Sequence, residues 1–432
     1  MKNKFIRSTI ILVISGAITK IMAMIIKIFL TRSITDDGIG LYMLVLPTFN
    51  LFITLCTLSL PTSISKLISE NRRSRRVILP LIPVSLGYNF ILIIVIFLIA
   101  PIIANYLLNN SDTYYPILGI GLTLPFICLS SILKGYFYGK EKMVPYAVAN
   151  NLEQLVRLIL IIFIIPKLIK YGINIAVCGV ILINILSEFS SIICLLLFVP
   201  NKKIKLSEFK INNEMIKDVL DISVNATGSR LIGSISYFLE PIILTFILTR
   251  IGYDSNYIVL EYGIINGYVF PLLLLPSFFT MAISTSLLPV ISGSNSRGNY
   301  SYSRKKLREA ICLSCLIGIV FTALVMSVPD IILKLIYNTD KGINYIRIIA
   351  PLFLMHYIQG PLTSCMQAIN MAKEAMIGTL MGAIVKNFLL ILLPFFLGIW
   401  GFIISSVCNI LFVTIHHIYY VNKYYSVMIM SR

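Results

Sequence analysis

The chemistry in this sequence is carried by a few charged side chains that lie within long apolar segments of the 432-residue chain. A charge near the centre of a bilayer costs about 2.5–3.5 kcal/mol on insertion scales, so such residues usually face a cavity or a partner. Lys20 and Lys27 are seven residues apart and share one helical face, which Arg32 continues. This basic stripe predicts binding of an anionic group such as a phosphate or pyrophosphate. The alternative, above all for Lys27, is that the lysines snorkel to lipid headgroups.

Glu153 and Arg157 form a second charged feature, because their i,i+4 spacing allows them to pair on one helix face. Two interpretations are open. The pair is a structural ion pair inside a helix bundle, or Arg157 faces a substrate cavity and Glu153 orients it. Arg230 is a further intramembrane cation. The predicted substrate-binding residues are therefore Lys20, Lys27, Arg32, Arg157, Glu153 and Arg230.

Glu240 has no basic residue near it in the sequence, since Arg230 is ten positions away and on a different helix face. A carboxylate inside a transporter helix is suited to binding a coupling ion, Na⁺ or H⁺. A pair with Lys386 or Arg230 is the alternative interpretation. His356 is interpreted as a hydrogen-bonded bundle residue rather than a proton relay. No cofactor and no metal site is predicted, because the eight cysteines lie in apolar stretches and the three histidines are scattered.

The composition of the chain indicates that these residues act inside a membrane. Hydrophobic residues make up 58%, charged residues 12%, and the mean hydropathy is +0.91. A soluble domain has about 45–50% apolar and about 25% charged residues. These values exclude a disordered chain, a soluble enzyme and a nucleic-acid-binding protein, although the net charge is +18. Because the connections are too short for a soluble catalytic domain, we expect no enzyme activity.

Twelve apolar segments are long enough to cross a bilayer as helices, which takes roughly 20 residues each. The expected fold is therefore an all-α integral membrane protein. Basic residues concentrate in the even-numbered connections and the two tails, so the positive-inside rule predicts that both termini are cytoplasmic. The predicted spans are 8–30, 40–66, 77–104, 114–137, 143–166, 172–198, 218–247, 262–291, 309–333, 347–370, 374–396 and 398–420.

The second half of the sequence repeats features of the first half, which predicts two six-helix lobes in a parallel repeat. Leu30-Thr31-Arg32 ends the first span, and Leu248-Thr249-Arg250 ends the seventh. Pro47 and Pro271 occupy matching positions in the second span of each half, where each is either a hinge or a static kink. The predicted parts are an N-lobe (1–200), a cytoplasmic linker (201–217), a C-lobe (218–420) and a cytoplasmic tail (421–432).

Four segments, in this order, resemble the stage V sporulation protein B-like, polysaccharide-transport branch of the multidrug/oligosaccharidyl-lipid/polysaccharide (MOP) exporter superfamily. They are GLYMLVLPTFNLFITLCTLSLPTSISKLISEN (Gly40–Asn71), KGYFYGKEKMVPYAVANNLEQLVR (Lys134–Arg157), YGIINGYVFPLLLLPSFFTMAISTSLLPVIS (Tyr262–Ser292) and PLTSCMQAINMAKEAM (Pro361–Met376). The similarity covers nearly the whole chain. The chain departs from the family in two ways. It has twelve predicted spans where relatives usually have fourteen, and it has a glutamate rather than an aspartate at position 240.

The resemblance implies two lobes around a V-shaped, MATE-type cavity and alternating access by rocking of the lobes. It implies a flippase for an undecaprenyl-pyrophosphate-linked saccharide in the bacterial cell membrane, with lipid II for spore-cortex peptidoglycan as the expected substrate. Basic residues line the cavity of MurJ-type relatives, and an acidic residue of their seventh helix takes part in cation binding, the place that Glu240 occupies here. Membrane lipids and peptidoglycan synthases are the implied partners. Nucleic acid is not expected as a partner, and the chain is expected to be a monomer.

The main alternative is a cation-coupled multidrug exporter of the MATE type. That function would favour an acidic, aromatic-lined cavity. The charges interpreted as intramembrane are instead five basic residues (Lys20, Lys27, Arg157, Arg230 and Lys386) and three acidic residues (Glu153, Glu188 and Glu240). A membrane-embedded glycosyltransferase would need a cluster of catalytic acids and a substantial external loop, which the sequence does not show. A scaffold without transport would not explain so many costly intramembrane charges.

Overall fold

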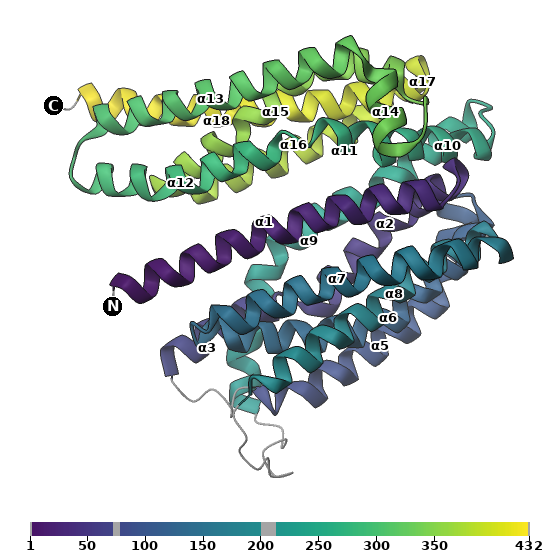
Figure 1. Ribbon diagram of the computed structural model, residues 1–432, viewed down its shortest axis with the longest axis horizontal. Coiled ribbons are helices and arrows are strands. Elements are labelled where there is room, and N and C mark those ends of the chain that lie inside the picture. Colours follow the sequence, from purple (N-terminus) through teal and green to yellow (C-terminus); the bar gives the residue numbers. More distant parts are fainter. Residues whose placement is uncertain (1, 72–77, 200–212, 431–432) are drawn as a thin grey trace. The chain divides into compact units, whose positions relative to one another are not determined.

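The computed structural model describes residues 2–71, 78–199 and 213–430, and every regular element in these ranges is a helix (Figure 1). The predicted all-α fold class is confirmed. Ten helical segments in these ranges are long and apolar enough to cross a membrane, judged by length and composition. The predicted spans 143–166 and 347–370 are also helices, α7 (Met143–Leu168) and α15 (Ile343–Ala368). Each has 26 residues and is about 39 Å long, enough to cross a bilayer.

The helices form two compact units, unit 1 (Met1–Ile242) and unit 2 (Ile243–Arg432). The boundary falls inside a single helix, α9 (Asn213–Arg250). The sequence places the division in the linker 201–217 instead, and most of that segment, 200–212, lies outside the described residues. The division into an N-lobe, a linker and a C-lobe therefore stays a prediction.

Unit 1 is built around α6, which packs against α2, α3, α5 and α8, while α7 packs against α1 and α8. Buried apolar side chains of α2, α5 and α6, among them Val45, Ile96 and Ile120, form one core of this unit. The helices of unit 1 are α1 (Lys2–Ser33), α2 (Asp36–Thr57), α3 (Leu60–Asn71), α5 (Leu81–Ile102), η1 (Ile103–Leu107), η2 (Ser111–Thr113), α6 (Tyr114–Gly139), α7, η3 (Ile169–Tyr171), α8 (Ile173–Leu197) and the first part of α9.

The predicted second span, 40–66, is divided into α2 and α3. Leu58 and Ser59 have φ angles of 43° and 52°. Residues in this left-handed region cannot continue a right-handed helix, so the chain stops and starts again. Pro47 lies buried inside α2, which continues past it to Thr57. The predicted hinge residue is thus not at the break itself, and its hinge role stays a prediction.

Two glycines of α6 allow α3 to approach closely. A Cβ atom added at Gly135 would lie 2.8 Å from Cα of Pro61, and one at Gly139 would lie 2.8 Å from the carbonyl oxygen of Ser65. Small residues four apart are the usual means by which membrane helices bring their backbones together. The contact between α3 and α6 therefore depends on the absence of side chains at these two positions.

Replacing Gly139 by alanine is expected to destabilise the protein by about 1–3 kcal/mol, because the added methyl group must displace the backbone of α3. The measurement is the apparent unfolding temperature in detergent. The matched control is Gly87→Ala in α5, where an added Cβ meets nothing within 4 Å. Equal unfolding temperatures for the two variants would contradict the close contact between α3 and α6.

Unit 2 is built around α15, which packs against α12, α13, α16 and α18. Leu287, Leu362 and Tyr425 are among the buried residues of its core. The helices of unit 2 are the last part of α9, α10 (Ser255–Ile264), η5 (Ile265–Val269), α11 (Phe270–Leu273), α12 (Ser277–Ser296), α13 (Tyr300–Ser327), α14 (Pro329–Tyr337), α15, α16 (Ala372–Leu392), α17 (Pro394–Leu397) and α18 (Ile399–Met430).

The predicted eighth span, 262–291, is also divided, into the end of α10, the π-helical turn η5, α11 and α12. Pro271 lies in a continuous helical run from Ser255 to Leu273, directly after the π-helical turn, and Pro276 immediately precedes α12. Pro271 is therefore inside a helical run, as Pro47 is, and its hinge role also stays a prediction. The predicted split between the last two spans at Gly398 is confirmed, because this residue has a φ angle of 56° between α17 and α18.

Candidate functional site

Four charged side chains gather inside unit 1. Lys134 is on α6, Glu153 and Arg157 are on α7, and Glu188 is on α8. Because α8 packs against both α6 and α7, it brings the three helices together. Glu153 lies ten residues into α7, about 15 Å along the helix axis. We call these four residues the ion network.

Glu153 is the centre of the ion network, with one cation at each of its oxygens. Nζ of Lys134 lies 2.6 Å from Oε2 of Glu153 and 3.4 Å from Oε2 of Glu188. Nη2 of Arg157 lies 2.9 Å from Oε1 of Glu153. The side chains of Glu153 and Glu188 are only 8% and 11% exposed. Lys134 therefore joins two buried carboxylates from different helices.

The charges of the ion network balance, since it contains two cations and two anions. Buried ions are tolerated when they are paired and hydrogen-bonded, whereas removing one partner costs about 3–5 kcal/mol. The amide of Gln154 also donates to Oε1 of Glu153, at 3.5 Å. These contacts tie α6, α7 and α8 to one another at the level of Glu153.

The predicted pairing of Glu153 with Arg157 is confirmed. Arg157 is not fully enclosed, because its side chain is 23% exposed. Its Nε atom is buried and has no hydrogen-bond partner among the described residues. The guanidinium group is thus oriented by Glu153, and the side chain remains partly accessible. Whether it serves structure or substrate binding stays a prediction.

The basic stripe lies on α1, which packs against α7. Oγ1 of Thr19 donates to Oδ1 of Asn151 at 3.1 Å, so the face of α1 that contains Thr19 contacts α7. Lys20 follows Thr19 in the helix and is exposed, Lys27 is half-buried, and Arg32 is exposed in the last turn. The stripe therefore runs along the flank of α1 beside the contact with α7. Its predicted role in substrate binding is not tested by this placement.

Arg230 and Glu240 are both on α9 and both belong to unit 1. They are ten residues apart, about 15 Å along one helix. Arg230 is exposed, whereas Glu240 is 3% exposed. Glu240 is in electrostatic contact with Tyr237 on the same helix, and Tyr237 with Tyr42 of α2. The carboxylate of Glu240 is thus buried.

Sequence reasoning did not single out Lys134. The signal was present, because Lys134 lies within the predicted span 114–137 like the other intramembrane charges. Glu188 is visible as an intramembrane charge too, but its partner on α6 is not local in sequence. Among the described residues, no group of three or more His, Cys, Asp or Glu side chains is placed to hold a metal ion.

Comparison with known proteins relates this architecture to transporters. The family model described as polysaccharide biosynthesis protein matches residues 5–295, and the MatE model matches residues 265–393. Stage V sporulation protein B of Bacillus subtilis (strain 168) is 32% identical, with 98% of this chain and 84% of that protein covered. The lipid II flippase MurJ of the same organism is 22% identical, with 89% and 76% covered.

A solved structure shares the fold. The inward-facing conformation of a multidrug resistance MATE family transporter of the MOP superfamily has a TM-score of 0.75 and 16% identity, with 95% of each chain covered. The long apolar helices and the shared fold together define a multi-pass membrane protein with the fold of MATE transporters. More particularly, the chain belongs to the polysaccharide biosynthesis protein family, as the matching segments of the sequence predict.

Proposed function

We propose that this protein is a flippase for an undecaprenyl-pyrophosphate-linked saccharide, with lipid II as the substrate. The observation that carries the proposal is the 32% identity to stage V sporulation protein B over 98% of the chain, together with the match to the lipid II flippase MurJ. The name of the first relative also favours a role in sporulation, and the process that we propose is spore-cortex synthesis. The protein acts in the bacterial cell membrane by alternating access, with both termini in the cytoplasm.

The pyrophosphate is proposed to bind basic side chains of unit 1. Lys20 and Lys27 provide point charges along α1, and Arg32 and Arg230 provide exposed guanidinium groups. Arg157 is held by Glu153 through Nη2, and its side chain is 23% exposed, so part of it can reach a ligand. An oriented guanidinium suits the planar, two-oxygen recognition of a phosphate group. This reasoning favours the substrate-binding interpretation of Arg157 over the purely structural one.

The test is transport of fluorescent lipid II in liposomes, measured as its accessibility to an external quencher. We expect the native protein to flip the lipid and both Lys20→Ala and Arg157→Lys to lose about tenfold or more in rate. That loss corresponds to one charge-assisted hydrogen bond of about 1.5–3 kcal/mol. Lys423→Ala, which removes an exposed lysine of α18, is the matched control and is expected to flip at the native rate.

One result would replace the proposal by its alternative. If the native protein flips no lipid II with or without a Na⁺ or pH gradient, and instead drives efflux of a cationic dye, the protein is a cation-coupled exporter of the MATE type. If Lys20→Ala flips lipid II at the same rate as Lys423→Ala, the protein is still a flippase, but the basic stripe does not take part in binding the substrate.

A further inference from the structure

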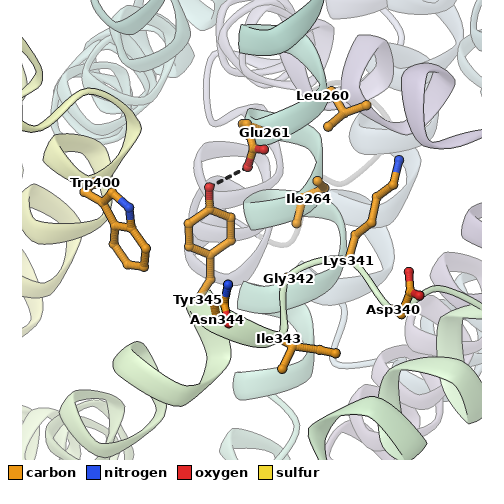
Figure 2. Close-up of a pocket in the computed structure, with 10 residues that line it drawn as sticks. All are labelled: Leu260, Glu261, Ile264, Asp340, Lys341, Gly342, Ile343, Asn344, Tyr345 and Trp400. Carbon is orange, nitrogen blue, oxygen red and sulfur yellow. Dashed lines mark hydrogen bonds between the residues drawn. The ribbon is translucent and has the colours of Figure 1, made fainter.

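A pocket of about 590 Å³ opens in unit 2 (Figure 2). It is formed by α10, by the segment between α14 and α15 with the first turn of α15, and by the start of α18. Its volume lies within the range of about 300–1,000 Å³ that is usual for small-molecule sites. The lining residues with polar or aromatic side chains are Glu261, Asp340, Lys341, Asn344, Tyr345 and Trp400.

One wall of the pocket is aromatic and fixed in position. The rings of Tyr345 and Trp400 are 4.9 Å apart and inclined by 64°, an edge-to-face contact. The Tyr345 hydroxyl donates to Oε2 of Glu261 at 2.5 Å, as Figure 2 shows. Both contacts hold the Tyr345 ring, so the wall is preorganised. Oε1 of Glu261 remains as an acceptor for a ligand hydroxyl.

The two turns beside the pocket depend on glycine. Gly342 has a φ angle of 96°, and a Cβ atom there would lie 2.9 Å from Cγ2 of Val269. Gly398 has a φ angle of 56°, and a Cβ atom there would lie 2.7 Å from the hydroxyl of Tyr253. Side chains at either position would be strained and would also collide with neighbours. Both turns beside the pocket therefore require glycine.

The chemistry of the lining matches a sugar. The C–H faces of a sugar ring pack on aromatic side chains, and its hydroxyl groups donate to carboxylates and accept from amides and ammonium groups. Trp400 and Tyr345 offer the aromatic surface, while Glu261 and Asp340 offer carboxylates. The pocket lining has two carboxylates and one ammonium group, that of Lys341, so its net negative charge would repel a phosphate. A purely apolar ligand would cover these polar groups without offering them hydrogen bonds, which costs free energy.

We propose that this pocket binds a neutral saccharide of one or two rings. Its role rests on the proposed flippase function: in the proposed orientation the pocket opens on the external side, where it would hold the sugar part of the lipid after translocation. The ion network and the basic stripe belong to unit 1, so the pocket is a separate site with a separate ligand group.

Trp400 supplies the test, because it is the only tryptophan in the chain. The full-length protein in lipid nanodiscs, which contain no sugar-based detergent, is titrated with N,N′-diacetylchitobiose while tryptophan emission is recorded. We expect a saturable change with a dissociation constant on the order of 1 mM. Glu261→Gln and Asp340→Asn are each expected to weaken binding about tenfold. Asp330→Asn in the first turn of α14, outside the pocket, is the control and should bind like the native protein.

Two results would overturn the inference. One is the absence of a saturable response up to about 50 mM, well above the expected dissociation constant. The other is a saturable response to tetramethylammonium with which the disaccharide does not compete, because the pocket would then be an amine site. Binding is measured independently of transport, so the two proposals can fail separately. If the protein binds the sugar but flips no lipid II, this inference stands and the proposed function is wrong. If the protein flips lipid II but does not bind the sugar, the proposed function stands and this inference is wrong.

Discussion

Replacing Lys134 by methionine is expected to lower the apparent unfolding temperature by on the order of 10 °C. Lys134 contacts the carboxylates of both Glu153 and Glu188, at 2.6 and 3.4 Å. Without its ammonium group, two buried carboxylates are left with one cation between them, and an uncompensated buried charge costs about 3–5 kcal/mol. Thermal unfolding in detergent measures the effect.

The double variant Lys134→Met with Glu188→Gln separates charge from packing. It leaves one anion and one cation, the Glu153–Arg157 pair, and is therefore expected to recover most of the lost unfolding temperature. The control is Lys142→Met, since Lys142 is exposed at the start of α7 and a surface change is usually within about 0.5 kcal/mol. A double variant no more stable than Lys134→Met would contradict the charge balance of the ion network.

The local half of the ion network could be predicted from the sequence, and the other half could not. Glu153 and Arg157 are one helical turn apart, so their spacing alone predicts the pair. Lys134 joins them because α6, α7 and α8 pack together, and that packing is set by contacts far apart in the chain. Charge within an apolar segment identifies candidates, but their partners depend on tertiary structure.

The helices, too, could be predicted only where the sequence contains a local signal. Long apolar runs predict where helices lie, and the turn at Gly398 is marked by the residue itself. The break at Leu58 and Ser59 has no such mark, because neither residue type favours a positive φ angle. The aromatic pocket is equally hidden, since Tyr345 and Trp400 are 55 residues apart and meet only in the folded unit.

Replacing Glu240 by glutamine is expected to abolish the stimulation of transport by an ion gradient. Glu240 is 3% exposed and interacts electrostatically with Tyr237, which precedes it by three residues on α9. We propose that this carboxylate binds the coupling ion, Na⁺ or H⁺, because a buried carboxylate with neighbouring oxygens can hold a cation or take up a proton. Glutamine keeps the shape but removes the charge, so the ratio of rates with and without a gradient should fall to about one.

Three variants assayed in parallel make this result specific. Glu240→Asp keeps the charge and the family's usual residue type, so it is expected to retain the stimulation. Glu374→Gln, in the first turn of α16 in unit 2, removes a carboxylate elsewhere and should behave like the native protein. Imposing a Na⁺ gradient and a pH gradient separately identifies the ion, since only one should stimulate native transport and lose its effect in Glu240→Gln. Stimulation that survives in Glu240→Gln would mean that the ion binds at another position, and the two carboxylates of the ion network would be the next ones to replace.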